Sequence, residues 1–376
     1  MKTAVCLTLL FIATFLAYAN TFSVPFLLDD VLTVTRNEAV QADRFELDLG
    51  SRGLLRWTFT LNHWISGNNV WSYHVLNLLL HVLNGFLVFW ICQRILASWP
   101  ALKSNPLHSI QSSAALAAGF FLLHPLQTES VTYISSRSEL LSTNLYLAAF
   151  LLFVSVPHWS IGFGLSLGVG VLFFLGLGAK ETVITLPMAM LLYDWLFIRP
   201  AWGPIRSRWS FYITFVIGGV AAGWEILNRL MVSVGAGAEG TVPPWHYFLT
   251  QLRVLLRYIR LIVLPTGQTL DYDFPVYTTV NLTVMACAFA LAGILVVAWH
   301  CRKDYPMFAF SIVWFFLTLA PTSSIVPIAD VIFEHRMYLP LAGISLSIPL
   351  LFEVVYAQCR KRSDYLFQVR DSGRER

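Results

Sequence analysis

Apolar residues run along most of this chain in long stretches that short polar segments separate. Ten stretches are long enough to cross the hydrocarbon core of a bilayer as helices. They cover residues 4–21, 72–97, 112–127, 138–156, 160–178, 182–198, 209–228, 280–299, 306–321 and 339–358. The pattern predicts an all-α integral membrane protein with about ten spanning helices.

Two further segments have an amphipathic pattern. Residues 52–64 interleave leucine and phenylalanine with two tryptophans, which is typical of a helix that lies along the membrane interface. In residues 247–264, Arg253, Arg257 and Arg260 share one helical face. We expect an interfacial helix in the first segment, and an interfacial or re-entrant helix rather than an eleventh span in the second.

Composition agrees with a chain whose solvent is largely lipid. Hydrophobic residues make up 57% of the 376 residues and charged residues 12%, which excludes an ordinary soluble domain. The net charge of +4 is spread thinly, so we expect no nucleic-acid partner. Five cysteines show no CxxC motif and no zinc-like spacing, so we expect neither a disulfide framework nor a structural metal.

Basic residues in the short loops set the topology. By the positive-inside rule these loops are cytoplasmic, which puts the N-terminus inside and the two long loops, 22–71 and 229–279, outside. Residues 1–362 then form one transmembrane domain, and residues 363–376 form a charged tail that we expect to be disordered. A cleaved signal peptide is the alternative for residues 4–19, but the site at residues 18–20 is a weak cleavage signal, so we expect a retained helix. The loop residues that carry the bias are Arg94, Lys103, Arg199, Arg206, Arg208, Arg302, Lys303, Arg360, Lys361 and Arg362.

Two adjacent acids, Asp29 and Asp30, follow the first apolar stretch almost directly. Neighbouring carboxylates repel each other, which raises the proton affinity of one of them unless a cation or a donor stands nearby. The pair is a candidate general base, and a solvated loop cap is the alternative.

More charged residues gather at the outer ends of the predicted spans. Lys180 and Glu181 fill a turn between two apolar helices, where a charged pair is costly unless it faces a polar cavity. Cations placed outside, against the positive-inside bias, suit an anionic ligand, and a lipid phosphate is the anion found at that depth. A rigid Glu–Arg pair in a turn, or an aromatic-belt tyrosine, is the plainer alternative. The other members of this outer set are His124, Glu129, Arg137, Glu139, Arg253, Glu334, Arg336 and Tyr338.

Five motifs in register resemble one family. They are Asp29-Asp30, HPLQTESVTYISSRSELL at 124–141, AKETVITLP at 179–187, LDYDFP at 270–275 and FEHRMYLPLAG at 333–343. Together they resemble the transmembrane and tetratricopeptide-repeat O-mannosyltransferases, which have bacterial relatives and belong to the GT-C class of glycosyltransferases. The likeness runs in order along nearly the whole chain.

The resemblance implies a GT-C-type helical bundle, a polyprenyl- or dolichyl-phosphate sugar donor and a protein hydroxyl acceptor. Asp29 or Asp30 would deprotonate the acceptor in a single, inverting displacement. The donor phosphate would be held by Arg137, Lys180, Arg336 and Arg253. Supporting or sugar-binding roles would fall to His124, Glu129, Glu139, Glu181, Glu334 and Tyr338. No obligatory cofactor is expected, and a divalent cation at the paired acids is the alternative.

Family members continue after the YLP motif into a further span and 34-residue helical repeats, a pattern that these 376 residues do not show. We therefore expect a bacterial-type member that lacks the repeat domain. Either it is a truncated or minimal form, or acceptor binding is delegated elsewhere. The sequence predicts a multi-pass glycosyltransferase, in the plasma or endoplasmic reticulum membrane, that moves a sugar, mannose by resemblance, on the non-cytoplasmic face. A transferase for another sugar or acceptor, a transporter or flippase for a lipid-linked sugar, and an inactive scaffold are the alternatives.

Overall fold

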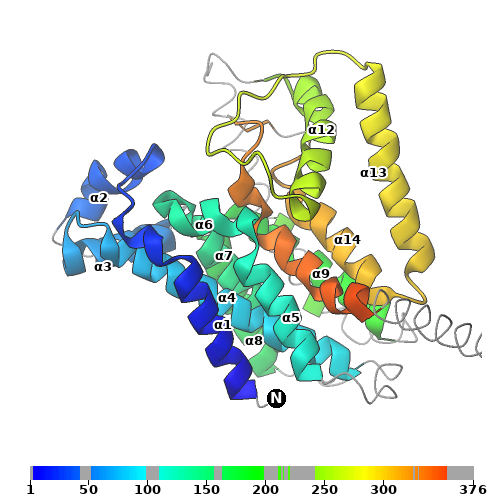
Figure 1. The fold of residues 1–376 in the computed structure, drawn as a ribbon, viewed down its shortest axis with the longest axis horizontal. Helices are drawn as coiled ribbons and strands as arrows, with labels where there is room; N and C mark the ends of the chain where they lie inside the picture. Colours follow the sequence, from blue (N-terminus) through cyan, green and yellow to red (C-terminus); the bar gives the residue numbers. More distant parts are fainter. Residues whose placement is uncertain are drawn as a thin grey trace, which may run out of the picture.

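The computed structural model describes residues 3–42, 52–98, 110–155, 163–198, 211–212, 215, 219–220, 242–324, 327–328 and 330–353. In these ranges every regular element is a helix (Figure 1). The longer ones are α1 (Thr3–Ala17), α3 (Gly53–Ser66), α4 (Trp71–Ser98), α5 (Ile110–Leu123), α7 (Arg137–Ser155), α8 (Phe163–Leu177), α9 (Leu186–Phe197), α12 (Pro244–Val263), α13 (Leu282–Cys301), α14 (Pro306–Leu319) and a last helix over residues 338–353.

Within the described ranges, three helical segments are long and apolar enough to cross a membrane: Trp71–Ala97, Ile134–Ser155 and Leu282–Cys301. Shorter apolar helices, α1, α5, α8 and α14 among them, accompany these. The predicted all-α membrane protein is confirmed at this level. The count of ten spans stays a prediction, because most of the predicted span 209–228 lies outside the described residues. The tail 363–376, which we expect to be disordered, also lies outside them.

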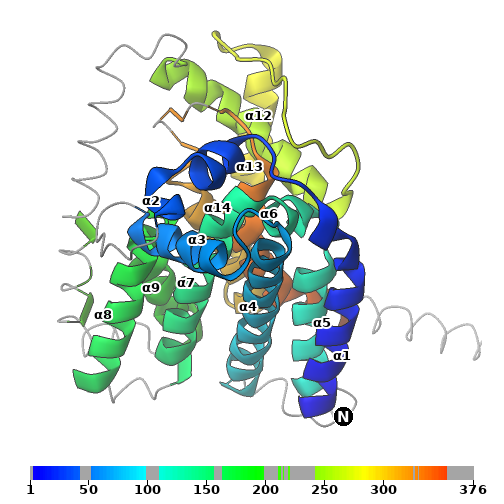
Figure 2. The ribbon, with the colours of Figure 1, turned by 90° about the vertical axis from the view of Figure 1, so that its left-hand side faces the viewer.

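The N-terminal two thirds of the described helices form a bundle. Helix α4 packs against α5 and α7, α1 packs against α5, and α7 packs against α8. Figure 2 shows these helices side by side, with α2 (Glu38–Gln41) and α3 lying across one end of α4 and α7. The predicted helix at 52–64 is therefore confirmed as a helix, while its place at a membrane interface stays a prediction.

A second layer follows along the chain. Helix α12 buries Val254, Tyr258 and Leu261 in an apolar cluster with residues of α13 and α14, and its arginines lie on other faces. The two helices α12 and α13 run beside each other at one side of the molecule (Figure 1). Helix α12 is not among the described helices apolar enough to span, which agrees with the amphipathic pattern of 247–264.

Buried polar side chains join α4 to α7 and to the last helix. The Tyr338 hydroxyl lies 2.7 Å from His81 Nδ1 and 3.1 Å from the Asn84 amide nitrogen. Asn84 also donates to the Leu140 carbonyl at 2.9 Å and accepts from Asn144 at 3.1 Å. Hydrogen bonds of this kind between apolar helices contribute about 0.6 kcal/mol each in a membrane. We call these residues the polar seam.

Short turns at one end of the bundle carry the motif residues. Pro125 starts η4 (Pro125–Gln127), which α6 (Thr128–Thr132) and η5 (Ile134–Ser136) follow before α7 begins. Proline suits a first helical position because it lacks the N–H that would have no partner there. Two other short turns, η6 (Glu181–Thr185) and η7 (Glu334–Met337), lie at the same end. Charged residues far apart in the sequence thus meet beneath α3.

Candidate active site

A cavity of about 320 Å³ lies at this end of the bundle. Its walls come from the segment after α1, from α3, from residues 133–138, from the turn before η6 and from η7 with the residues before it. Of the twelve predicted site residues, four line this cavity, which we call the outer cavity: Asp29, Lys180, Glu181 and Arg336.

The two adjacent acids behave differently. Asp29 is exposed and lines the outer cavity, and its backbone N–H donates to the Tyr133 hydroxyl at 3.0 Å. Asp30 is buried: its carboxylate accepts from the Ser135 N–H at 2.7 Å, the Ser135 hydroxyl at 2.6 Å and the Leu27 N–H at 3.0 Å. Burial raises the pKa of Asp30, whereas the sequence pattern suggested repulsion within the pair.

The turn between α1 and α3 explains this split. Leu28 adopts a φ of +44°, a region that residues with a side chain rarely enter. The Asp30 N–H donates back to the Leu27 carbonyl at 2.8 Å, and the Asp30 carboxylate accepts from the Leu27 N–H, so the turn closes on itself. The strain of such a backbone is sustained where surrounding contacts fix it, and here it leaves Asp29 facing the outer cavity.

Lys180 reaches the outer cavity from the turn between α8 and η6. Its ammonium donates to the carboxylate of Glu139 on α7, and both side chains are buried. Burying this ion pair costs desolvation free energy. Removing only one partner costs more, because the other would remain as an uncompensated buried charge. Glu139 thus fixes the position of Lys180 at the cavity wall.

Arg336 supplies a second cation. Its guanidinium donates to the Asp330 carbonyl at 2.7 Å and lies 5.6 Å from the centre of the Phe333 ring. Among the described residues no carboxylate forms an ion pair with Arg336, so its full charge is available to the outer cavity. Backbone carbonyls hold the guanidinium without neutralising it.

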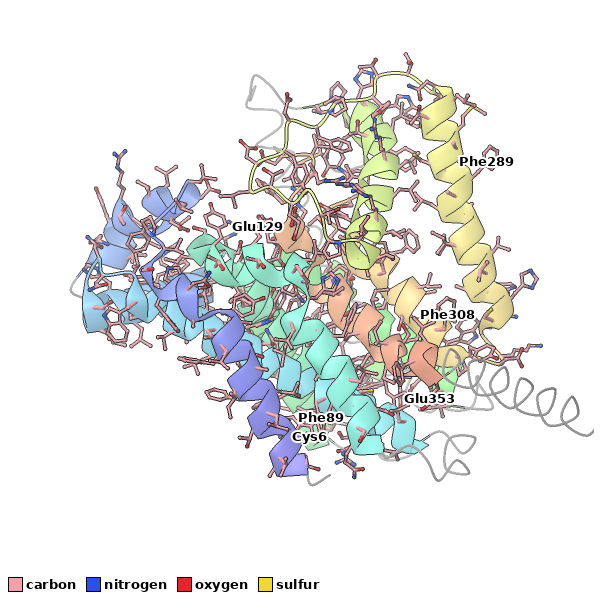
Figure 3. The ribbon with its side chains drawn as sticks, in the orientation of Figure 1. Cys6, Phe89, Glu129, Phe289, Phe308 and Glu353 are labelled. Carbon is pink, nitrogen blue, oxygen red and sulfur yellow. The ribbon has the colours of Figure 1, made fainter. Side chains whose placement is uncertain are left out.

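His335 lines the outer cavity with Glu129 behind it. The Glu129 carboxylate lies 2.5 Å from His335 Nδ1 and accepts from the His335 N–H at 3.0 Å. Burial raises the pKa of Glu129 to about 7. Burial also lowers the pKa of His335 to about 3, and the charges of Lys180 and Arg336 act in the same direction. Figure 3 shows Glu129 where the bundle meets the layer of α12.

Arg137, a predicted phosphate ligand, lies behind the wall of the outer cavity. Its guanidinium carbon is 4.4 Å from the centre of the Phe59 ring, and Phe59 is the residue that lines the cavity. The three guanidinium nitrogens donate to Asn77, to Thr58 and to the Tyr73 carbonyl at 2.7 to 3.1 Å. With its donors engaged and no exposed surface, Arg137 ties α7 to α3 and α4.

Other predicted residues lie elsewhere. His124 caps η4, accepting from the Leu126 N–H at 3.1 Å, and its other ring nitrogen is 3.0 Å from the Ile262 carbonyl. Arg253 lines a second cleft, between α12 and α13. Tyr338 belongs to the polar seam.

Glu334 faces away from the outer cavity and holds the loop that precedes α13. Its carboxylate accepts from the Gln268 amide at 2.6 Å, from the Thr269 N–H at 3.1 Å and from the Tyr272 hydroxyl. Tyr272 belongs to the LDYDFP motif, so two of the motifs meet at this carboxylate. The contacts give Glu334 the role of a loop anchor.

Sequence reasoning missed several residues of the outer cavity. Arg52 and Arg56, four residues apart on or next to α3, both line it, as do Tyr133 and Ser135. The sequence did contain a signal for the two arginines, because both lie in an amphipathic segment on the predicted outer side. We interpreted that segment only as an interfacial helix and did not consider its arginines as site residues. In the described ranges, no group of three or more His, Cys, Asp or Glu side chains is arranged to hold a metal ion.

Fold and cavity together define a helical membrane protein that gathers a carboxylate and buried cations at one end of its bundle. Comparison with known proteins then narrows the class. The chain is 24% identical over 317 residues to "Protein O-mannosyl-transferase F38B6.6" of Caenorhabditis elegans, a match that covers 80% of this chain. The chain is thus similar to the TMTC protein O-mannosyl-transferases over most of its length, which confirms the resemblance of the five motifs to that family.

Two more relatives agree. "Protein O-mannosyl-transferase Tmtc2" of Drosophila melanogaster is 26% identical over 295 residues, or 69% of this chain. Human "Protein O-mannosyl-transferase TMTC1" is 28% identical over 209 residues, or 48% of this chain. The matches span 42%, 29% and 22% of the lengths of the three relatives. No family model matches the chain, and no solved structure matches it.

Proposed function

We propose that this chain transfers a mannosyl group from a polyprenyl- or dolichyl-phosphate carrier to a serine or threonine hydroxyl of a protein acceptor. The observation that carries the proposal is one cavity in which the exposed carboxylate of Asp29 shares walls with the buried cations Lys180 and Arg336. The relatives are named protein O-mannosyl-transferases, which supports the same activity.

Each group has a distinct task in this reaction. Asp29 accepts the proton of the acceptor hydroxyl while that oxygen attacks the anomeric carbon of the sugar. The bond from the anomeric carbon to the phosphate oxygen breaks, and the lipid phosphate leaves with the electron pair and an added negative charge. Lys180 and Arg336 stabilise that charge without giving up a proton. One displacement of this kind inverts the anomeric centre.

The contacts revise which predicted residues act directly. Asp30 and Arg137 support the site from behind, because their polar atoms are already engaged and their side chains are buried. Glu139 positions Lys180, and Glu129 positions His335. Glu181 remains our candidate for binding a sugar hydroxyl, and Arg56 joins the candidate cations. By the positive-inside rule, we propose that the cavity opens on the non-cytoplasmic face.

A transporter of lipid-linked sugars gains no support from His81 and Asn84, two buried polar residues of α4. Transport would require polar groups near the bilayer midplane that are free to bind a substrate. His81 and Asn84 direct their side chains into the polar seam, and neither lines the outer cavity or the second cleft.

The test is transfer of radiolabelled mannose from polyprenyl-phosphate-mannose to protein in membranes that contain the chain. We expect Asp29→Asn to lower the rate by about a hundredfold or more, the usual contribution of a general base. Asp304→Asn is the matched control, because Asp304 is an exposed acid beyond α13 that does not line the outer cavity. Transfer by Asp29→Asn at the rate of the wild type would rule out Asp29 as the base.

A further inference from the structure

A second cleft, of about 530 Å³, lies away from the outer cavity, between α12 and α13. Arg253, Arg257 and Arg260 line it from α12, and Tyr272 and Phe274 line it from the loop before α13. Cys287 contributes from α13 itself. We call this the arginine cleft.

No acid among the described residues neutralises the arginines of this cleft. In the parts of the chain that the structure describes, none of the three forms an ion pair with a carboxylate. Arg257 donates to the Gly267 carbonyl at 2.6 Å and Arg260 donates to the Thr266 hydroxyl at 3.3 Å. Arg253 instead lies 5.7 Å from the centre of the Phe274 ring and 5.4 Å from that of Tyr277. Ring contacts hold a guanidinium by its face and leave its N–H edge free for an anion.

The helix on the other side of the cleft is suited to a lipid environment. Helix α13 is one of the three segments apolar enough to cross a membrane, and 22% of its most apolar window is buried within the protein. Leu282 and Phe289 on this helix are 82% and 72% exposed, and Phe289 projects away from α12 (Figure 3). A helix this apolar and this uncovered needs lipid around it. The cleft therefore lies between the cations of α12 and a helix whose far side is suited to lipid.

We infer that the arginine cleft binds the headgroup of a lipid phosphate monoester. A phosphate monoester carries close to two negative charges near neutral pH, which several unpaired guanidiniums satisfy better than a zwitterionic headgroup does. Arginine forks match phosphate oxygens in pairs, and Leu256, Phe274 and Pro275 give the cleft the apolar surface that the first methylenes of the lipid chains need. The arginine cleft and the outer cavity share no lining residue.

The experiment measures equilibrium binding of a fluorescent dioctanoyl phosphatidic acid to the purified full chain in a nonionic detergent. The test variant is Arg253→Gln with Arg260→Gln, which leaves the Arg257 contact with the Gly267 carbonyl in place. The matched control is Arg302→Gln with Lys303→Gln, which removes two charges just beyond α13, at residues that do not line the cleft. Unlabelled dioctanoyl phosphatidylcholine and inorganic phosphate serve as competitors.

We expect the test variant to bind phosphatidic acid at least about tenfold more weakly, and the control variant to bind it like the wild type. Neither phosphatidylcholine nor inorganic phosphate should compete at equal concentration. Equal affinity of wild type and test variant, or an equal loss in the control, would overturn the site. Competition by inorganic phosphate as strong as that by the lipid would overturn the lipid assignment. If the double variant fails to fold, Arg253→Gln alone gives the same decision, because no described residue accepts a hydrogen bond from Arg253.

Discussion

The carboxylate of Asp29 lines the outer cavity, while that of its neighbour Asp30 is buried against Ser135. The same change, to asparagine, should therefore affect stability very differently at the two positions. Asp30→Asn replaces one carboxylate oxygen with an NH2 group, which cannot accept the hydrogen bonds that Ser135 and Leu27 donate. We therefore expect a loss of about 1–3 kcal/mol in the free energy of unfolding. Asp29→Asn should leave stability within about 0.5 kcal/mol of the wild type. Thermal melting of the purified variants measures both, and similar losses at the two positions would contradict the assigned roles.

Lys180 and Glu139 allow stability to be separated from activity. Lys180→Met leaves the Glu139 carboxylate buried without its partner, so we expect a loss of about 3–5 kcal/mol. Combining it with Glu139→Leu removes both charges and should restore most of that stability. Mannosyl transfer should stay low in the double variant because the cation is still missing. Recovery of transfer together with stability would show that Lys180 has no direct part in the reaction.

Glu129 should make stability depend on pH. Its pKa is raised from an ordinary 4.5 to about 7, so between these values the folded chain holds a proton that the unfolded chain has released. The stabilising contribution is complete below about pH 4.5 and is lost as the pH rises through about 7. His335, whose pKa is lowered to about 3, acts in the opposite sense up to its ordinary 6.5 and masks part of this loss.

The difference between Glu129→Gln and the wild type isolates that contribution. Glutamine keeps the shape but does not titrate, so the variant should gain stability relative to the wild type as the pH rises from about 4.5 to 7. Chemical denaturation at four or five pH values measures the difference. A difference that stays constant over this range would mean that Glu129 titrates normally.

The contacts of Glu334 should appear in the dynamics of the loop before α13. Glu334→Ala removes the acceptor of the Thr269 N–H, so we expect the Thr269 amide to exchange hydrogen at least about tenfold faster. Asp271→Asn is the control on the same loop, because its carboxylate accepts no hydrogen bond from the described residues. Mass spectrometry of peptides covering residues 266–274 resolves the two outcomes.

The periodic part of the fold could be predicted from the sequence. The stretches 72–97, 138–156 and 280–299 become α4, α7 and α13, since a run of apolar residues in lipid must satisfy its own backbone as a helix. The amphipathic pattern of 247–264 correctly distinguished α12 from the helices that are apolar enough to span a membrane, because arginines recur on one face of this segment. The positions of the loops between the predicted helices also indicated that the charged motif residues would gather at one end of the bundle.

Side-chain direction at those ends could not be predicted, because it depends on contacts between distant segments. Nothing in an Asp-Asp pair says that Ser135 will bind the second acid. Arg137 has the charge of a phosphate ligand, yet the Phe59 ring covers it. Arg253 lies on the predicted helix but lines a different cleft. The charge pattern of a sequence indicates on which side of the membrane a residue lies. Tertiary packing then determines which cavity its side chain enters.

The polar seam has a consequence for how the chain is made. His81 and Asn84 leave the ribosome more than 250 positions before Tyr338, which supplies the hydroxyl that both of them contact. Until the last helix arrives, those two side chains have an open position within an apolar bundle, where water is scarce. Completion of the seam therefore waits for residues 338–353, and a chain cut short before residue 338 would present an unfinished polar surface to membrane quality control.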